Sequence, residues 1–119
     1  YRPIHMIGLE LGLSVASAAL RKEPTGSARC FNSDVVATAK RALAAGETLD
    51  GEGGYTVYGR LAPAADSLKL GALPLGLAHG VRLRRAVAAH APVRWDDVDF
   101  DPANDTVRFR REMEAAFTR

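Results

Sequence analysis

Apolar residues dominate the start of the chain and predict a helix over residues 3–20. Pro3 suits a first helical turn, and the sequence Glu23-Pro24-Thr25-Gly26 ends the helix. Within this range only Glu10 is an Asp, Glu, Lys or Arg. Apolar side chains point in several directions around the helix: Ile4, Met6, Ile7, Leu9, Leu11, Leu13 and Val15. Because such a helix must be covered on most sides, we expect a further domain or subunit to cover it.

After a polar linker at residues 23–33, the hydrophobic period changes to that of short strands. Alternation and β-branched residues predict strands or extended segments at residues 34–39, 55–58, 73–77 and 81–85. Residues 73–77 place three leucines on one face. Helical spacing returns after Asn104 and predicts a terminal amphipathic helix with the apolar stripe Phe109, Met113, Ala116 and Phe117.

An internal repeat relates the two halves of the strand region. Residues 40–52 align with residues 84–96 without a gap, at an offset of 84 − 40 = 44 positions. Two basic residues, an Ala-x-Ala-Ala run, two apolar anchors and a final acidic residue match. This pattern predicts a compact body with pseudo-twofold symmetry, and chance similarity in an Ala-rich chain is the alternative.

These patterns predict a mainly β fold with flanking helices. Residues 1–22 are expected to form a helix that another domain or subunit covers, and residues 23–33 a linker. Residues 34–101 are expected to form the pseudo-twofold β domain, and residues 102–119 the C-terminal helix. Because Tyr1 is neither an initiator Met nor part of a signal-peptide layout, we expect a piece of a longer polypeptide.

Composition narrows the classes of function. The chain has 119 residues, 47% hydrophobic and 25% charged, which is typical of one globular domain. The formal charge is only +2, so nucleic acid is not expected as a partner. No apolar run is long enough to predict a membrane span. The single cysteine, Cys30, rules out an intrachain disulfide and favours a cytoplasmic location.

No residue of this chain is predicted to be catalytic, to bind a metal or to bind a cofactor. The three histidines lack metal-ligand spacing, and His5 and Glu10 are predicted to lie on different faces of the first helix. The glycine-rich run 51–54 lacks the Gly-Lys-Ser/Thr ending of a phosphate loop and is interpreted as a turn.

Two groups of residues are candidate contact sites. Basic residues concentrate at Lys40 and Arg41 in one half of the repeat and at Arg84 and Arg85 in the other. They either bind an anion or an acidic partner, or act as strand-edge charges that prevent sheet pairing. We favour the strand-edge interpretation. In the first helix, the Gly8-x-x-x-Gly12 spacing around Glu10 allows another backbone or a ligand to come close.

The repeat resembles the SAF family, whose members have a β-clip fold. Residues 35–52 (VVATAKRALAAGETLDGE) and 81–98 (VRLRRAVAAHAPVRWDDV) look like its two half-patterns. In each, a strand precedes Ala-x-x-x-Leu-x-x-Gly-Glu and a short acidic turn. His90-Ala91 depart from this pattern where Gly46-Glu47 match it.

The whole chain also resembles the C-terminal part of homoserine-dehydrogenase-like oxidoreductases, including the deoxyxylulose phosphate reductoisomerase-like enzymes of isoprenoid precursor synthesis. Three runs carry this resemblance: YRPIHMIGLELGLSVAS at 1–17, GEGGYTVYG at 51–59 and LPLGLAH at 73–79. The resemblance implies an upstream Rossmann NAD(P) domain and a central catalytic and dimerisation domain. Gly8, Glu10 and Gly12 would then lie next to the active site of that parent enzyme.

The leading hypothesis is therefore a non-catalytic SAF-like domain of an NAD(P)-dependent oxidoreductase. It would pack on the upstream catalytic domains and shape the active-site cleft or a homodimer. The alternative is an independent sugar-acid or anion-binding module that uses Arg41, Arg84 and Arg85. A third hypothesis, an ice-binding surface, comes only from antifreeze relatives, and the charged strands argue against it.

Overall fold

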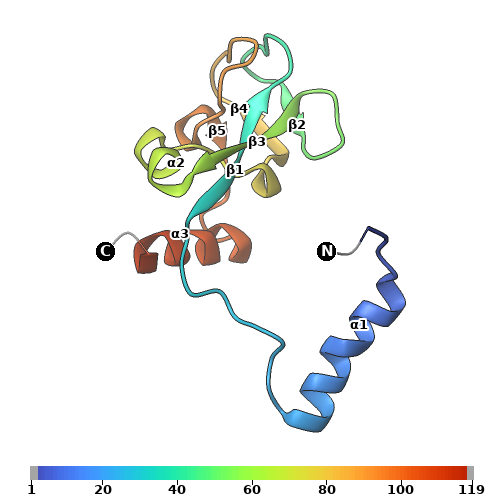
Figure 1. The fold of residues 1–119 in the computed structure, drawn as a ribbon. Coiled ribbons are helices and arrows are strands. Elements are labelled where there is room, and N and C mark those ends of the chain that lie inside the picture. Colours follow the sequence, from blue (N-terminus) through green and yellow to red (C-terminus); the bar gives the residue numbers. More distant parts are fainter. Residues whose placement is uncertain (1–2, 118–119) are drawn as a thin grey trace.

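The computed structural model describes residues 3–117 and contains a mainly β body between helices (Figure 1). We call residues 33–100 the β body. Its strands are β1 (Ser33–Ala39), β2 (Thr48–Asp50), β3 (Val57–Pro63), β4 (His79–Leu83) and β5 (Val98–Asp99). The helices are α1 (Ile7–Ala16), α2 (Ala64–Leu70) and α3 (Asp105–Phe117), with a π-helical turn at Ser17–Arg21 and 3-10 turns at Leu75–Leu77 and Trp95–Asp97.

The strands form two small antiparallel sheets. β1 pairs with β3, and β4 lies between β2 and β5. Isolated bridges join β1 to the loops, from Val36 to Pro74 and from Thr38 to Pro92. The predicted mainly β fold with flanking helices is thereby confirmed.

A reciprocal pair of backbone hydrogen bonds marks the pseudo-twofold axis. The Leu43 N–H donates to the Val87 carbonyl at 2.8 Å, and the Val87 N–H donates to the Leu43 carbonyl at 2.9 Å. These residues are 87 − 43 = 44 positions apart, the offset of the sequence repeat. Residues that are equivalent in the two halves therefore face each other across the axis.

Other hydrogen bonds obey the same offset. Gly46 N–H donates to the Leu83 carbonyl at 2.8 Å, and its equivalent His90 N–H donates to the Ala39 carbonyl at 2.9 Å. Gly46 and His90 both have left-handed backbone conformations, with φ of 89° and 63°. His90 therefore accepts a conformation that suits glycine because its turn must match the turn of the other half.

Apolar side chains from both halves fill a single core between the two sheets. The largest fully buried ones include Leu43, Leu49, Leu73, Leu83, Val57, Val93 and Val98. Trp95 lies at the edge of this core, where its ring meets Phe100 edge-on at 5.2 Å between centroids. The two half-repeats therefore share one hydrophobic core.

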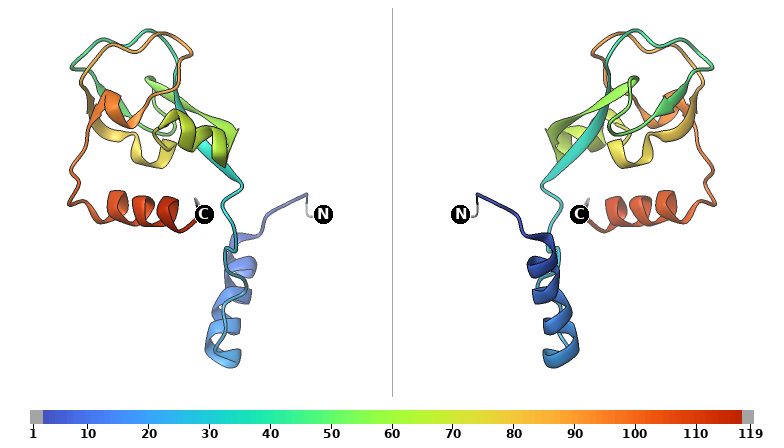
Figure 2. Two further views of the ribbon diagram at one scale, coloured as in Figure 1. Left: turned by 90° about the vertical axis from the view of Figure 1, so that its left-hand side faces the viewer. Right: turned by 90° about the vertical axis from the view of Figure 1, so that its right-hand side faces the viewer.

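The N-terminal helix projects away from the β body on an extended segment (Figures 1 and 2). The Cα radius of gyration is 17.2 Å, whereas a compact domain of this length would have about 13.5 Å. No residue of α1 is buried. The β body therefore does not bury any side of this apolar helix.

Helix α1 begins at Ile7 rather than at Pro3. The amide groups of Leu9 and Glu10 both donate to the Met6 carbonyl, so the chain enters the helix only after Met6. His5 therefore lies outside the helix, and its Nδ1 lies 3.3 Å from a Glu10 carboxylate oxygen. The prediction that these two side chains lie apart is wrong, because the angular rule applies only within a continuous helix.

Four other details differ from the predicted elements. Residues 75–77 form a 3-10 turn instead of an extended segment, and the third strand begins at Val57 rather than at residue 55. Helix α2 has no counterpart among the predicted elements. Helix α3 buries Val107 and Glu114 rather than the predicted stripe, and Phe109 is 72% exposed.

A buried ion-pair network fixes α3 to the β body. The Arg110 guanidinium donates to Asp34 at 2.5 and 3.2 Å and to Glu114 at 2.7 Å. Ser67 donates to the same Asp34 carboxylate at 2.5 Å. Burial alone would lower the pKa of Arg110, but these hydrogen bonds outweigh it and raise the pKa, so the side chain stays charged. The neighbouring Arg111 stacks over the Trp95 ring at 3.8 Å.

We predict that Arg110→Met lowers the free energy of unfolding by about 3 kcal/mol, because it leaves the Asp34 carboxylate buried without its cation. The side chains of Arg110 and Asp34 are only 13% and 5% exposed. Urea denaturation followed by circular dichroism measures the change. Arg108→Met on the same helix removes only exposed ion pairs and serves as the control, with an expected change of about 0.5 kcal/mol or less. We call this ion-pair network the α3 clamp. Equal losses of unfolding free energy in both variants would show that the clamp does not stabilise the protein.

Candidate functional site

The most unusual surface of the molecule is the apolar surface of α1 and its flanking residues. Eight large apolar side chains there are 57–82% exposed: Ile4, Met6, Ile7, Leu9, Leu11, Leu13, Val15 and Leu20. Contiguous exposed apolar surface of this kind marks an interaction site in a soluble protein. We therefore treat this helix as the candidate functional site.

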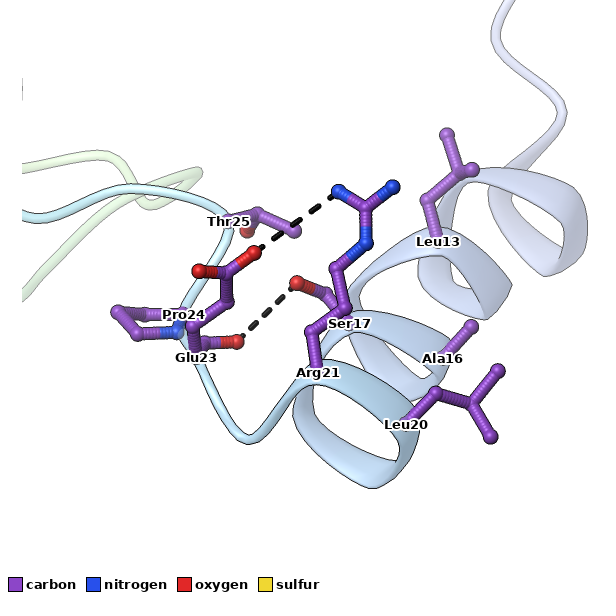
Figure 3. Close-up of a pocket in the computed structure, with 8 residues that line it drawn as sticks. All are labelled: Leu13, Ala16, Ser17, Leu20, Arg21, Glu23, Pro24 and Thr25. Atoms are coloured by element: carbon purple, nitrogen blue, oxygen red, sulfur yellow. Dashed lines mark hydrogen bonds and ion pairs between the residues drawn. The ribbon is translucent and has the colours of Figure 1, made fainter.

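A hollow of about 490 Å³ lies between the end of this helix and the returning chain (Figure 3). Ser17 Oγ donates to the Glu23 carbonyl at 3.1 Å, and the Arg21 guanidinium lies 3.8 Å from the Glu23 carboxylate. These contacts turn the chain back along the helix after Lys22, whose φ is 59°. Leu13, Ala16 and Leu20 line the helix side of the hollow.

Gly8 and Gly12 lie on the exposed helix in open space. A Cβ atom added at either position would meet no described atom within 4 Å. Glu10 is placed one turn from the helix start, where it pairs with His5. The structure thus leaves room for another backbone beside both glycines.

The basic residues of the first half-repeat are held by partners within the β body. Lys40 Nζ donates to the Gly54 carbonyl at 2.5 Å, and Arg41 makes two hydrogen bonds to the Glu47 carboxylate at 2.8 and 3.3 Å. The Arg41 hydrogen bond lowers the pKa of Glu47, and the Ala44 N–H adds to this effect. These contacts stabilise the turn that follows β1.

The basic residues of the second half-repeat are also paired. Arg84 Nε lies 2.5 Å from Asp99, and Arg85 Nε donates to Asp97. Arg85 is the equivalent of Arg41, but Ala91 stands at the position equivalent to Glu47, so Asp97 supplies the carboxylate instead. All four basic side chains therefore contact groups of the protein itself.

A tight loop connects β2 to β3 around Asp50. Its carboxylate accepts hydrogen bonds from the Tyr55 N–H at 2.5 Å, from the Thr56 N–H at 3.0 Å and from the Thr56 hydroxyl. The Thr56 hydroxyl is the largest cause of a pKa for Asp50 of about 2, with the Tyr55 amide next. A Cβ atom at Gly54 would overlap the Asp50 carboxylate, so glycine is required there. The glycine-rich run is thus a turn, as predicted.

The sequence patterns did not indicate two features of the structure. One is the Asp34–Arg110 pair, whose members are 110 − 34 = 76 positions apart; only the i, i+4 spacing of Arg110 and Glu114 was visible. The other is a cavity lined in part by Arg60, for which no local pattern exists.

Within residues 3–117, no three or more His, Cys, Asp or Glu side chains lie close enough together to hold a metal ion, and no helix is both long and apolar enough to cross a bilayer.

We predict that Asp50→Asn destabilises the protein at neutral pH and that the difference from the wild type disappears in acid. The folded-state pKa of about 2 lies below the ordinary value of about 3.9, so ionised Asp50 favours the folded state. This stabilisation is present above pH 4 and is lost as the pH falls toward 2. Urea midpoints of both proteins between pH 2 and 7 provide the measurement, and Asp101→Asn provides a matched control. A difference between the two urea midpoints that stays constant from pH 7 to pH 2 would show that ionised Asp50 does not stabilise the loop.

The β body matches the family model described as the SAF domain over residues 34–99, which is more than half of the chain. A comparison with curated proteins gave no match. The matched segment contains both half-repeats and the hydrogen bonds that relate them. The chain therefore belongs to the SAF domain family.

Proposed function

We propose that this chain is the accessory SAF-containing part of an NAD(P)-dependent oxidoreductase of the homoserine-dehydrogenase-like or reductoisomerase-like kind. In this proposal α1 packs into the upstream catalytic domains, and the β body borders the active-site cleft or a dimer contact. The exposed apolar surface of α1 carries the proposal. The resemblance of residues 1–17, 51–59 and 73–79 to those enzymes supplies the class of partner.

The distribution of apolar residues around α1 indicates how this helix is covered. One partner helix covers a single stripe, as in a coiled coil. Here the exposed residues include Leu9, Leu11 and Leu13. Each step of two residues turns about 200° around the helix axis, so Leu11 lies on the side opposite to the other two. Several partner elements are needed to bury them all. A groove within a larger domain meets this requirement better than pairing with one copy of the same helix.

The energetics of the isolated helix support the same conclusion. A helix of this length is marginal in water because nucleation is costly. Gly8 and Gly12 each weaken it further by about 1 kcal/mol relative to alanine. Burial of its large side chains would stabilise it by roughly 1.5–3 kcal/mol for each one fully covered. The two glycines therefore lower the stability of the isolated helix but allow a partner to approach its backbone closely.

The connecting segment suits a helix that belongs to one body and a β domain that belongs to another. Residues 22–32 lie outside helices and strands and are exposed apart from half-buried Phe31. Eleven such residues span at most about 40 Å. This length allows the β body to sit beside the domains into which α1 is inserted. In this arrangement NAD(P) is bound upstream, and no residue of this chain holds it.

The proposal is tested by comparing residues 1–119 with a longer protein that includes the sequence encoded upstream of Tyr1. Titration calorimetry with NADPH is expected to show binding by the longer protein and none by residues 1–119. Micromolar binding by residues 1–119 alone, or no nucleotide binding by the longer protein, would overturn the proposal.

A charge placed on α1 tests the docking itself. We predict that Leu9→Asp costs the longer protein roughly 3 kcal/mol of stability, because the carboxylate would be buried without a partner. The same change is expected to have little effect on residues 1–119, where Leu9 is exposed. Leu61→Asp, at an exposed position of the β body, is the control and should leave both proteins nearly unchanged. Equal effects of Leu9→Asp in the two proteins would contradict the docking of α1.

A further inference from the structure

A second cavity, of about 260 Å³, lies on the β body between the β1–β3 sheet and α2. It is smaller than the roughly 300–1,000 Å³ of sites for drug-sized ligands, so it suits a small molecule. Its walls are mostly apolar, and four polar residues interrupt them: Thr38, Arg60, Asp66 and Ser67. The apolar part comprises Val36, Leu61, Ala62, Pro63, Leu70 and Pro92.

The cavity lies where the pseudo-twofold symmetry is broken. Thr38 is equivalent to Arg82, since 82 − 38 = 44. Arg82 extends over the turn of the other half, and its Nε donates to the Gly46 carbonyl at 3.1 Å. Thr38 is too short to reach as far. The substitution of a small side chain for a long one helps to leave this side of the body hollow.

Arg60 differs from Arg41, Arg84 and Arg85 because, among residues 3–117, no acidic side chain pairs with it. Arg41, Arg84 and Arg85 each have a carboxylate within hydrogen-bond distance. Arg60 also lines the cavity with Asp66, and the two form no ion pair among residues 3–117. A guanidinium beside an apolar cavity presents a planar set of donors that matches a carboxylate in bidentate fashion.

The hydroxyl groups of the cavity differ in their availability. Ser67 donates to Asp34 at 2.5 Å and is committed to the α3 clamp. Thr38 is buried, and its hydroxyl makes only a long contact of 3.5 Å to the Val36 carbonyl. Such a contact is weak, so the Thr38 hydroxyl is available to bond a ligand. Asp66 adds a carboxylate that accepts hydrogen bonds from a ligand hydroxyl.

We propose that this cavity binds a small hydroxy-carboxylate. The ligand carboxylate pairs with Arg60, its hydroxyl bonds to Thr38, and its hydrocarbon part contacts the apolar wall. A single guanidinium balances one negative charge, whereas the nearby Asp66 carboxylate disfavours a phosphate dianion. A monocarboxylate therefore fits better than phosphate. The inference uses only the β body, so it does not depend on the proposed oxidoreductase context.

Titration of residues 1–119 with L-lactate, followed by ¹H–¹⁵N NMR, tests the proposal. Saturable shifts in the millimolar range are expected at the amides of Arg60, Leu61 and Leu70. Lactamide has nearly the same shape without the charge and is expected to bind at least tenfold more weakly, as is inorganic phosphate. Equal shifts with lactate and lactamide, or no saturable shift with lactate, would overturn the proposal.

Two variants separate the roles of charge and hydroxyl. Arg60→Gln is expected to weaken lactate binding by about tenfold or more, because it removes charge-assisted hydrogen bonds. Arg29→Gln, an exposed arginine of the connecting segment, is the matched control and should have no effect. Thr38→Val keeps the side-chain shape and is expected to weaken lactate binding but not acetate binding. Similar affinities for the Arg60 and Arg29 variants would rule out the site, whatever the outcome of the NADPH experiment.

Discussion

The reciprocal hydrogen bonds between Leu43 and Val87 are the constraint on which the β body depends. Because equivalent residues of the two half-repeats bond to each other, the turns on either side must adopt the same backbone path. This requirement explains why His90 takes the left-handed conformation that glycine takes at residue 46. It also brings the apolar anchors of both halves into one core, from which the two sheets and α2 extend.

The sequence allowed the symmetry and the exposed helix to be predicted because both leave local patterns. The offset of 44 positions is the offset of the hydrogen bonds, and an all-round apolar helix has no partner in a small β body. Helix α2 also left local signals, with Pro63 before it and Gly71 after it in the left-handed conformation. A segment of only seven residues is too short for these signals to predict a helix.

Other features depend on contacts between distant residues, and no local pattern predicts them. Leu75 and Leu77 contact the core from a 3-10 turn, although the alternation of residues 73–77 is typical of a strand. Helix α3 is oriented by Arg110 and its buried carboxylates, which leaves Phe109 exposed. Similarly, the basic residues of the repeat leave open an anion site beside the favoured strand-edge role, and only the structure shows that Glu47, Asp97 and Asp99 pair with Arg41, Arg85 and Arg84.

Main-chain hydrogen bonds set the relative position of the two halves, and this has a consequence for how the halves diverge. Positions such as Thr38 and Arg82, or Glu47 and Ala91, are equivalent in backbone but unconstrained in chemistry. A duplicated unit of this type can keep one half as scaffold while the other acquires a new surface. The two halves of the β body can therefore share one backbone fold and still present surfaces of different chemistry.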